Sequence, residues 1–505
     1  NLIISNFIFT FLVIFKTMQI NLIYLRFNLK KIKILSLLSL FIGTSILAVS
    51  QKIELINPTF LGNERRNYYG NKAPDTLKLI WKHYLGEGKT TISKNIEDQI
   101  WAGAGWTGQP LLYKESDSLY LIQGSLDHHL KKINASNGNL IWQYRFDDAI
   151  KGTGTIWHNE KAKNKVHELI IFQGSKLGYG KNINTKHIPS FRAISLVDGS
   201  ELWRFDVKKT KSYSRDVDGS PLIIEDTLYI GLENGLLAAI DPDPDHVQYV
   251  DSMFQPPILH EHKLFTKQDI FDHKNNLVTE SSPSKLGNHL FIASGSGHIY
   301  GYNFLKDTID WEFYVGSDID GSAIITDDSC VISTIEKQYI IGRGGVFKFN
   351  PKKYGTESVE WFFPVENNEK GSWEGGIVGS AAINDFYEKS SKLAAFVSVK
   401  GNLYLINHEI IDQEITNLGP NEKYRYPSPL LLDKINIGPS ISTPLLIHDK
   451  LIVAGYQGLK LFKITTNQTL ELLASYSTAF EATPFVYDEK IYVASRDGFL
   501  YCFGN

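Results

Sequence analysis

The chain has 505 residues, of which 43% are hydrophobic and 12% aromatic, so a large core can be buried. Its 52 basic and 55 acidic residues give a net charge of −3, which argues against a nucleic-acid partner because phosphate binding needs a basic face. The two cysteines, Cys330 and Cys502, exclude a disulfide framework and are predicted to be small core residues.

Residues 1–50 differ from the rest of the chain because they contain no acidic residue. We interpret residues 1–17 as upstream translation, although their apolar run also resembles a membrane segment. Residues 18–50 have the pattern of a cleavable signal peptide, with a basic start, an apolar stretch and small residues before Gln51. An uncleaved anchor is the alternative. We therefore expect a periplasmic or secreted protein without a lipoprotein cysteine and without a transmembrane domain in the mature chain.

Residues 51–76 form an N-terminal extension, and residues 77–84 have the pattern of a strand that no repeat precedes. The repeat itself is clearest at residues 216–241. A turn of small residues is followed there by an apolar strand, a second strand, a glycine turn and a third strand. A β repeat of this length predicts a propeller. Residues 247–250 are predicted to be the fourth strand of this unit, and residues 255–278 to be a polar connection.

Eight such repeats can be aligned at their first turn. They start at Thr107, Lys151, Asp218, Glu280, Asp320, Val378, Ile441 and Glu481. The eighth repeat has three strands and no fourth, whereas the strand near Trp81 is a fourth strand without a repeat. We therefore predict an all-β, eight-bladed propeller over residues 77–505. Its four-stranded antiparallel blades close when the N-terminal strand completes the last blade, which leaves no unpaired edge.

The repeat endings at residues 137–142 and 198–203 combine Asn-Gly or Asp-Gly with Leu-Ile-Trp or Leu-Trp, and Ser-Pro or Thr-Pro recurs at 220, 282, 443 and 483. In these features residues 77–505 resemble the quinoprotein-like, or PQQ-repeat, β-propeller family. The resemblance implies eight blades and tryptophans that dock between neighbouring blades. By that resemblance the docking residues are Trp81, Trp142, Trp203, Trp311 and Trp361.

This family contains quinone-dependent alcohol and sugar dehydrogenases, and also scaffolds without a cofactor, including an outer-membrane assembly lipoprotein. The chain lacks the adjacent cysteine pair of many of the dehydrogenases, a haem-attachment motif, and the lipoprotein cysteine of the assembly factor. The resemblance therefore leaves both roles open.

Acidic residues gather at the repeat starts. The innermost strand of each propeller blade lines the central channel, so Asp218, Glu280 and Asp320 are predicted to converge near one mouth. Carboxylates about 8 Å apart repel by about 2 kcal/mol at an effective dielectric of 20, which raises their pKa values or recruits a cation. The candidate ligand or cation site comprises Asp216, Asp218, Glu280, Asp318, Asp320, Glu481, Arg215, Trp373 and Glu374.

The alternative interpretation of these carboxylates is turn chemistry, in which Asp caps a tight Asp-Gly turn. His260 and His262 could bind a metal from one strand face, but no third ligand is near them in the sequence. No nucleophile-elbow or nucleotide-binding motif is present in the sequence.

The preferred hypothesis is an exported, monomeric propeller that acts as a binding or assembly scaffold at the cell envelope, without a redox cofactor and without enzymatic activity. Its partners would be envelope proteins, which contact the channel mouth and the segments 177–190, 255–278, 366–376 and 410–438. One alternative is a dehydrogenase that depends on PQQ and calcium. The other is a glycan-binding propeller that uses Trp106, Trp157 and Trp373 as stacking platforms.

Overall fold

The computed structural model describes residues 52–91, 98–368, 373–388 and 391–505, together with Lys16, Met18, Gln19 and Asn21. The chain divides into two compact units, residues 1–53 and 54–505. The predicted signal segment lies outside the described residues except for three positions, as do four residues of the predicted contact segment 366–376. No helix among the described residues is long and apolar enough to cross a membrane.

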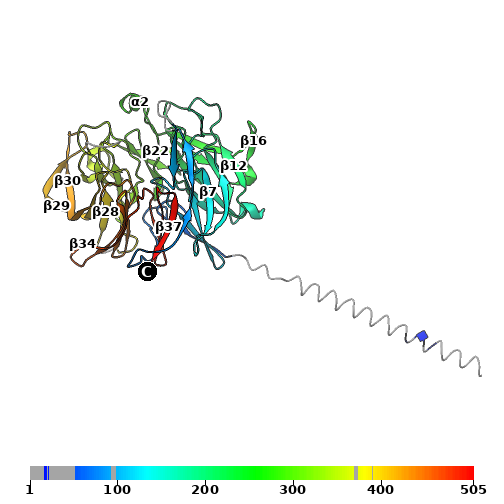
Figure 1. Ribbon diagram of the computed structural model, residues 1–505. Helices are drawn as coiled ribbons and strands as arrows, with labels where there is room; N and C mark the ends of the chain where they lie inside the picture. Colours follow the sequence, from blue (N-terminus) through cyan, green and yellow to red (C-terminus); the bar gives the residue numbers. More distant parts are fainter. Residues whose placement is uncertain are drawn as a thin grey trace, which may run out of the picture. The chain divides into compact units, whose positions relative to one another are not determined.

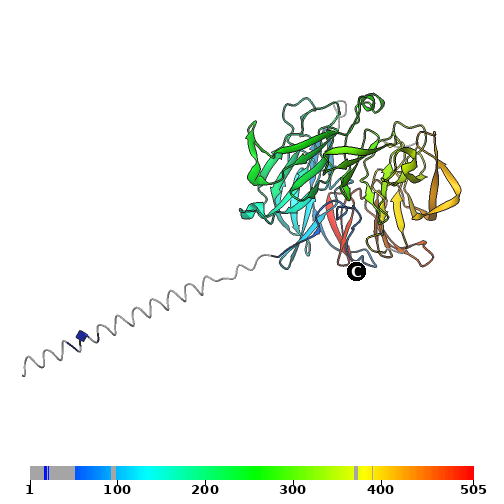
Figure 2. The same ribbon diagram turned by 180° about the vertical axis from the view of Figure 1, so that it is seen from behind.

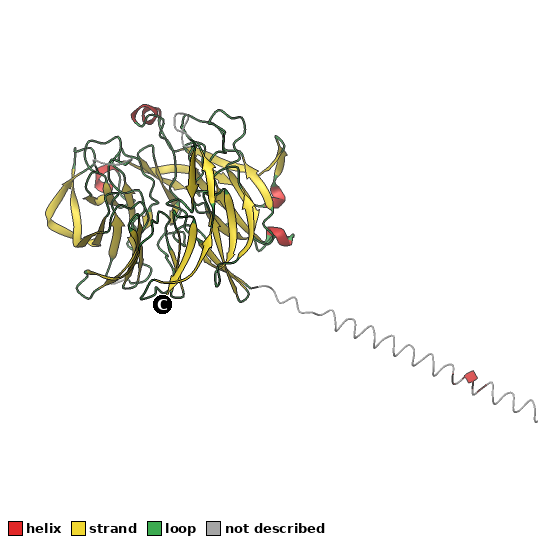
Figure 3. Ribbon diagram, in the orientation of Figure 1, coloured by secondary structure: helices red, strands yellow, loops and turns green. Residues whose placement is uncertain are grey.

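The second unit consists almost entirely of antiparallel sheets, with a few short helices (Figure 3). Blade 1 contains β5 (Leu111–Glu115), β6 (Ser118–Gly124), β7 (His129–Asn134) and β8 (Leu140–Arg145), and β1 (Ile53–Asn57) lies beside β5. Blade 2 contains β9 (Thr155–His158), β10 (Leu169–Gly174), β11 (Phe191–Ser195) and β12 (Glu201–Phe205). Blade 3 contains β13 (Leu222–Ile224), β14 (Thr227–Leu232), β15 (Leu236–Ile240) and β18 (Ile258–Lys263). Blade 4 contains β19 (Ser284–Leu286), β20 (His289–Ser294), β21 (His298–Asn303) and β22 (Thr308–Tyr314).

The remaining blades repeat the same order. Blade 5 contains β23 (Ile324–Ile325), β24 (Val331–Ile335), β25 (Gly345–Phe349) and β26 (Val359–Pro364). Blade 6 contains β27 (Ala382–Ile383), β28 (Leu393–Val397), β29 (Asn402–Leu418) and β30 (Arg425–Asn436). Blade 7 contains β31 (Leu445–Ile447), β32 (Lys450–Gly455), β33 (Gly458–Ile464) and β34 (Leu470–Tyr476). Blade 8 contains β35 (Phe485–Tyr487), β36 (Lys490–Ala494), β37 (Phe499–Gly504) and β2 (Lys78–Tyr84).

Elements outside the blades are short. The hairpins are β3 (Glu87–Thr90) with β4 (Gln99–Ala102), and β16 (Gln248–Val250) with β17 (Met253–Gln255). The helices are α2 (Lys267–Asp272) and the 3-10 turns η1 (Lys165–His167), η2 (Pro244–His246) and η3 (Gly355–Ser358). Both cysteines are buried and unpaired, as predicted.

The predicted closure of the ring is confirmed. β2 pairs antiparallel with β37, and Trp81 lies opposite Cys502. β37, drawn in red, accordingly lies beside the blue strand β2 (Figures 1 and 2). The middle strands of the blades are buried on both faces because each blade packs between two others. For this reason β15 and β25 are buried along their whole length.

The predicted fourth strand of blade 3 is wrong. Residues 248–250 pair with residues 253–255 in a separate hairpin, because Asp251 and Ser252 take positive φ values of 49° and 65° and turn the chain back. The blade is completed instead by β18, inside the predicted polar connection. The sequence of β18 is largely polar because β18 is the outermost strand of its sheet and much of it is exposed.

A ring of hydroxyl groups links the starts of successive blades. In blades 3 to 6 the backbone N–H at the repeat start donates to a hydroxyl of the following blade at 2.9 Å: Ser220 to Ser282, Ser282 to Ser322, Ser322 to Ser380, and Ser380 to Thr443. All five side chains are buried. This hydroxyl ring shows that the first strand of each blade lies nearest the centre.

Residues 54–76, the N-terminal arm, fill the channel on one side of the hydroxyl ring. Thr59 bonds to Thr155 and Ser220, and Asn67 donates to the carbonyl of Ile325. Tyr69 accepts from Ile383 and from Val486, on the far side of the ring. Further bonds reach blades 1 and 4, and Phe60, Leu61 and Tyr69 are almost fully buried. The arm therefore closes the channel at this level.

Candidate functional site

On the other side of the hydroxyl ring, the position two residues earlier is charged in five of the eight repeats, those of blades 2 to 5 and blade 8. At this level blades 2 to 5 contribute, in order, Lys151, Asp218, Glu280 and Asp320. Blades 6 and 7 contribute Val378 and Ile441, which are buried together with Val399 against Trp106 and Trp373. The channel wall is thus charged on one side and apolar on the other.

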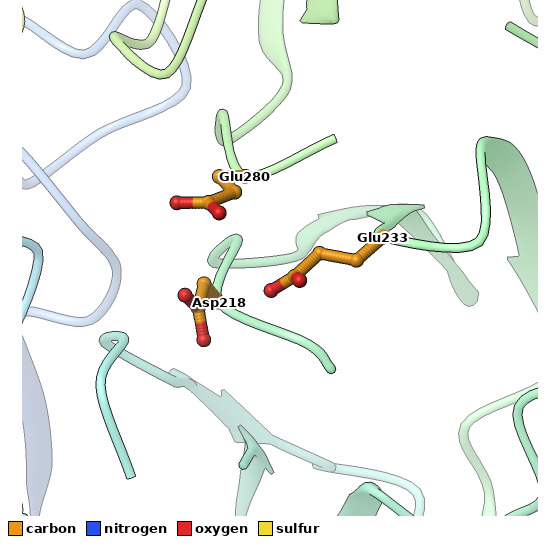
Figure 4. Close-up of side chains that lie close together, drawn as sticks. All are labelled: Asp218, Glu233 and Glu280. Carbon is orange, nitrogen blue, oxygen red and sulfur yellow. The ribbon is translucent and has the colours of Figure 1, made fainter. Parts of the chain in front are cut away.

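Three carboxylates converge within the charged half. Oxygens of Asp218, Glu233 and Glu280 lie within 4.8 Å of one another, and the three side chains point toward a common centre (Figure 4). Asp218 and Glu280 come from repeat starts, whereas Glu233 directly follows β14. Both oxygens of Asp218 and one oxygen of Glu233 are buried, and apart from the nearby ammonium of Lys151 they have no hydrogen-bond partner among the described residues.

Lys151 supplies the positive charge of this cluster. Its Nζ lies 2.5 Å from Asp218, 3.7 Å from Asp216 and 3.8 Å from Glu233. Burial opposes the charged form of this lysine, but the carboxylates, Asp218 first among them, raise its pKa well above the ordinary value. The ammonium of Lys151 is therefore a positive charge built into the protein beside Asp216, Asp218 and Glu233.

Burial also changes the carboxyl groups. It raises the pKa of Glu233 and of Glu280 well above the ordinary value, and it raises the pKa of Asp218, against which the neighbouring Lys151 acts. A single ammonium cannot balance several buried carboxylates, so part of the compensation comes from bound protons.

A second group of acids lies beside the first. Asn276 Nδ2 donates to Asp318 Oδ2 at 2.5 Å, and burial raises the pKa of Asp318 to about 6. Burial raises the pKa of Asp320 and of Glu336 well above the ordinary range, and the charge of Glu336 raises the pKa of Asp320 further.

A cavity of about 560 Å³ opens over the Lys151 cluster. Its acidic wall comes from blades 2 to 4 and includes Asp216, Glu233, Glu280 and the ring of Tyr213. The cavity is also lined by Asp148, by Lys176 and Lys181 from the segment after β10, and by Trp101 from β4. Because the N-terminal arm fills the channel beyond the hydroxyl ring, this cavity opens at one mouth.

Comparison with known proteins agrees with the architecture. Residues 73–248 match the family model described as outer membrane protein assembly factor BamB. The structure of BamB from Moraxella catarrhalis is 11% identical with a TM-score of 0.50, and the match covers 85% of this chain and 100% of that one. Quinohemoprotein alcohol dehydrogenases from Comamonas testosteroni and Pseudomonas putida HK5 are 11% and 12% identical, with TM-scores of 0.55 over 89% of this chain and 80% of theirs. No curated protein sequence matches the chain. The predicted resemblance to PQQ-repeat β-propellers is confirmed.

The five tryptophans of the PQQ-repeat endings each contact the following blade. Four indole N–H groups donate to carbonyls of that blade at 2.9 to 3.1 Å: Trp81 to Ala135, Trp203 to Pro242, Trp311 to Lys353, and Trp361 to His408. Trp142 packs on Gly199, which has a φ of +78° and where a Cβ would lie 3.0 Å from the indole ring. The Asn-Gly and Asp-Gly turns thus leave room for the preceding blade's tryptophan.

Several predicted site residues lie apart from the three carboxylates. Glu481 accepts from Tyr456 at 2.9 Å and lies 3.7 Å from Arg496. Arg215 is buried, but its guanidinium donates to the carbonyls of Val207 and Thr185, each at 2.6 Å, so it supports a loop. Asp216 does line the cavity, where it also accepts from the backbone N–H of Leu177.

The remaining candidates also have other partners. Trp373 packs against the apolar half of the channel. Glu374 is largely exposed and lies 3.9 Å from Lys337. His260 and His262 both pair with Asp307, at 2.8 and 2.6 Å, on the outer strand of blade 3. Of the glycan platforms, Trp157 packs with its ring tilted against Phe172 of the same blade, and Trp106 joins the apolar half.

Sequence reasoning missed Glu233 and Glu336. Each directly follows the second strand of its blade, β14 in blade 3 and β24 in blade 5. The same position is serine in blades 1, 2, 6 and 8. Aligning the repeats there, as well as at their starts, would have identified both glutamates.

Proposed function

We propose that the chain is a binding scaffold of the cell envelope that works without a redox cofactor. The observation that carries this proposal is the position of Lys151, whose ammonium lies 2.5 to 3.8 Å from three carboxylates of the channel. The ammonium of Lys151 supplies positive charge that a bound metal ion would otherwise supply. Lys151, together with bound protons, can therefore balance the carboxylates of the channel without an added cation.

The residues do not fit a calcium ion in this arrangement. Calcium takes six to eight oxygen ligands at about 2.3–2.6 Å, and the carboxylates of Asp218, Glu233 and Glu280 are near enough to contribute. The ammonium of Lys151, however, lies 2.5 Å from Asp218, at the distance where an ion would bind. Binding of calcium, and of a quinone cofactor that requires it, would need the Lys151 side chain to move away from Asp218.

The long hairpin of blade 6 supports a protein partner. β29 and β30 extend beyond the blade, and β30 packs on β26 of blade 5. The hairpin exposes five large apolar side chains: Ile410, Ile415, Leu418, Tyr424 and Leu431. Clustered exposed apolar groups mark interaction surfaces. BamB, whose family model matches residues 73–248, is by its description an assembly factor for outer membrane proteins.

Affinity capture from envelope extracts tests this role with matched variants. Ile415→Glu with Leu431→Glu places two charges on the hairpin, and Phe271→Glu places one on α2, where Phe271 is 77% exposed. We expect a reproducible envelope partner to be lost from the hairpin variant and kept by the α2 variant. Equal capture by both variants, or none by the wild type, would contradict the proposal.

The second candidate function is a calcium- and quinone-dependent dehydrogenase. The meeting of three carboxylates within 4.8 Å favours it. Terbium luminescence and calcium titration of the wild type and of Lys151→Ala separate the two candidates. Under the scaffold proposal we expect calcium to bind only to Lys151→Ala, because the ammonium that occupies the site in the wild type is then absent. Calcium binding by the wild type, with dye-linked alcohol oxidation after addition of PQQ, would establish the dehydrogenase instead.

A further inference from the structure

A carboxylate on the outside of the propeller is held by two histidines. His260 Nδ1 lies 2.8 Å from one oxygen of Asp307, and His262 Nε2 lies 2.6 Å from the other. The described part of the chain contains other histidine–carboxylate pairs within 4.0 Å, but in each of those a single histidine contacts the acid. Asp307 is thus the one carboxylate of the described residues at which two imidazoles meet.

The three side chains come from neighbouring blades. His260 and His262 belong to β18, the outer strand of blade 3, and Asp307 lies in the turn between β21 and β22 of blade 4. The pairing of β18 with β15 is regular from His260 to Lys263, so these two histidines project from the same face of the strand. The sequence alone offered this histidine pair no third ligand. The fold supplies one from 45 residues beyond His262.

The atoms that face one another here are those that zinc binds. Imidazole nitrogens and carboxylate oxygens bind zinc at about 2.0–2.2 Å, so two ligands of one ion lie about 3 Å apart. The two nitrogen–oxygen distances at Asp307, 2.8 and 2.6 Å, are close to this separation. The hydrogen bond with His262 lowers the pKa of Asp307 below its ordinary value, so this carboxyl is ionised at neutral pH. A bound ion would take the place of the two imidazole protons that now point at the carboxylate.

One side chain has to rotate when an ion binds. The two nitrogens contact different oxygens of the carboxylate, and the three ligand atoms do not all lie within 4.8 Å of one another. The His260 side chain is 52% exposed, so its imidazole has room to turn toward the oxygen that His262 contacts. Tyr302 fixes that oxygen, because this almost fully buried residue donates its hydroxyl to Asp307 Oδ1 at 2.9 Å. Its ring also lies 5.0 Å from the ring of His262. Two of the three ligands are therefore preorganised, and the exposed one adjusts.

No cation of the protein competes for this carboxylate. Among the described residues, no lysine or arginine nitrogen lies within 4.0 Å of Asp307, whereas Lys151 lies 2.5 Å from Asp218 in the channel. The neighbouring Lys306 is 3.8 Å from Asp310 instead. The two histidines and Asp307 are at least 26% exposed, so an ion can reach them from solvent and water can complete its coordination.

We propose that His260, His262 and Asp307 bind a divalent transition-metal ion of the zinc class, with water as the remaining ligand. Imidazole nitrogens suit zinc, copper and nickel, whereas magnesium and calcium prefer oxygen ligands alone. Because its ligands come from blades 3 and 4, the ion also links the outer edges of two blades. This inference goes beyond the proposed scaffold function, and neither the Lys151 cluster nor the hairpin of blade 6 takes part in it.

Isothermal titration of the full chain with zinc chloride tests the proposal, with magnesium chloride as the control ion. We expect zinc to bind, and magnesium to bind at least about tenfold more weakly, because magnesium does not favour imidazole. Thermal unfolding gives an independent measurement. Zinc is expected to raise the Tm, since an ion that binds only the folded state stabilises it, and magnesium is not. Zinc binding no tighter than that of magnesium would overturn the proposal and leave Asp307 as a bridge between two histidines.

Variants assign the ion to these three residues. Asp307→Asn keeps the shape of the side chain, and asparagine tolerates the φ of 52° at this position, so the variant is expected to fold. His260→Gln and His262→Gln each keep a hydrogen-bond donor. Each of the three variants is expected to weaken zinc binding at least about tenfold, since even an outer partner of a metal ligand is typically worth that much.

His246→Gln is the matched control, because it removes an exposed histidine that is alone with Asp241, at 2.8 Å. It should leave the zinc affinity and the zinc-dependent rise in Tm unchanged, whereas Asp307→Asn should lose that rise. Unchanged zinc binding in Asp307→Asn, or an equal loss in His246→Gln, would overturn the assignment.

Discussion

The two sides of the hydroxyl ring are lined by the same eight first strands, yet they are built from opposite kinds of interaction. On the arm side, buried polar groups are paired, as with Thr59, Asn67 and Tyr69. On the mouth side, carboxylates crowd around one lysine, and apart from its ammonium their buried oxygens lack partners among the described residues. The contrast separates the part of the channel that stabilises the fold from the part that is strained electrostatically, which is where a ligand site is expected.

The largest effect is expected from the arm side. Arg66 is fully buried and donates to Pro283 O, Thr59 Oγ1, Phe60 O and Ser220 O at 2.6 to 3.3 Å. Arg66→Ala would leave a cavity and unpaired acceptors, so we expect the free energy of unfolding to fall by about 3 kcal/mol or more. Denaturant unfolding measures it. The adjacent exposed Arg65, which pairs with Asp327 at 3.3 Å, is the control, and Arg65→Ala should cost under about 1 kcal/mol. Equal losses would mean that the arm is not a structural plug.

The next effect concerns the mouth side and depends on pH. Burial raises the pKa of Asp318 from 3.8 to about 6, so the folded state holds this proton more tightly than the unfolded state. The resulting stabilisation is complete below about pH 4 and is lost as the pH rises through 6, an effect of up to about 3 kcal/mol. Asp318→Asn cannot titrate.

We therefore expect the stability of Asp318→Asn relative to the wild type to increase between pH 4 and pH 7. Unfolding curves at both pH values measure the change, and the exposed Asp117→Asn serves as the control with no such trend. A constant difference between Asp318→Asn and the wild type would show that the carboxylates of this channel are not perturbed by burial.

The parts of the fold could be predicted from the sequence to different degrees. The eight blades and the closing strand follow from local signals, the alternation of apolar residues and the glycine turns, which neighbouring blades reinforce. The prediction of the fourth strand of blade 3 failed because residues 248–250 have the β-branched and aromatic pattern of a strand. They do form a strand, but the turn at Asp251 and Ser252 pairs it with residues 253–255 and not with the blade. β18, being outermost and partly solvated, lacks the apolar pattern that identifies its neighbours.

The site was harder to predict than the fold. Asp218, Glu280 and Asp320 could be found because they occupy equivalent positions in the repeat. The partnership with Lys151 could not, since a repeat alignment places the lysine at the same level without showing that its side chain turns toward Asp218. The position of the N-terminal arm in the channel could not be predicted from the sequence, because its contacts depend on the assembled ring of blades and not on a local pattern.

The hydroxyl ring between the two sides is expected to give an intermediate effect. Ser322→Ala removes the acceptor of the Ser282 N–H, a buried bond of 2.9 Å, and leaves that donor unpaired. A loss of about 1–2 kcal/mol is expected in denaturant unfolding. Ser136→Ala, at an exposed turn, is the matched control and should change stability by less than about 0.5 kcal/mol. A loss in Ser322→Ala no larger than in the control would show that the ring does not hold the blades together.

The smallest effect is expected at Glu481, which lies at the same level of the repeat as Asp218 but outside the cluster. Its carboxylate is 3.7 Å from Arg496 and accepts from Tyr456, and its side chain remains partly exposed. Glu481→Gln keeps the shape and an acceptor for Tyr456, so we expect the free energy of unfolding to change by less than about 1 kcal/mol. Denaturant unfolding measures this change. A larger loss would show that Glu481 is held by more than Arg496 and Tyr456, and the division of the channel level into a coupled half and an independent half would then fail.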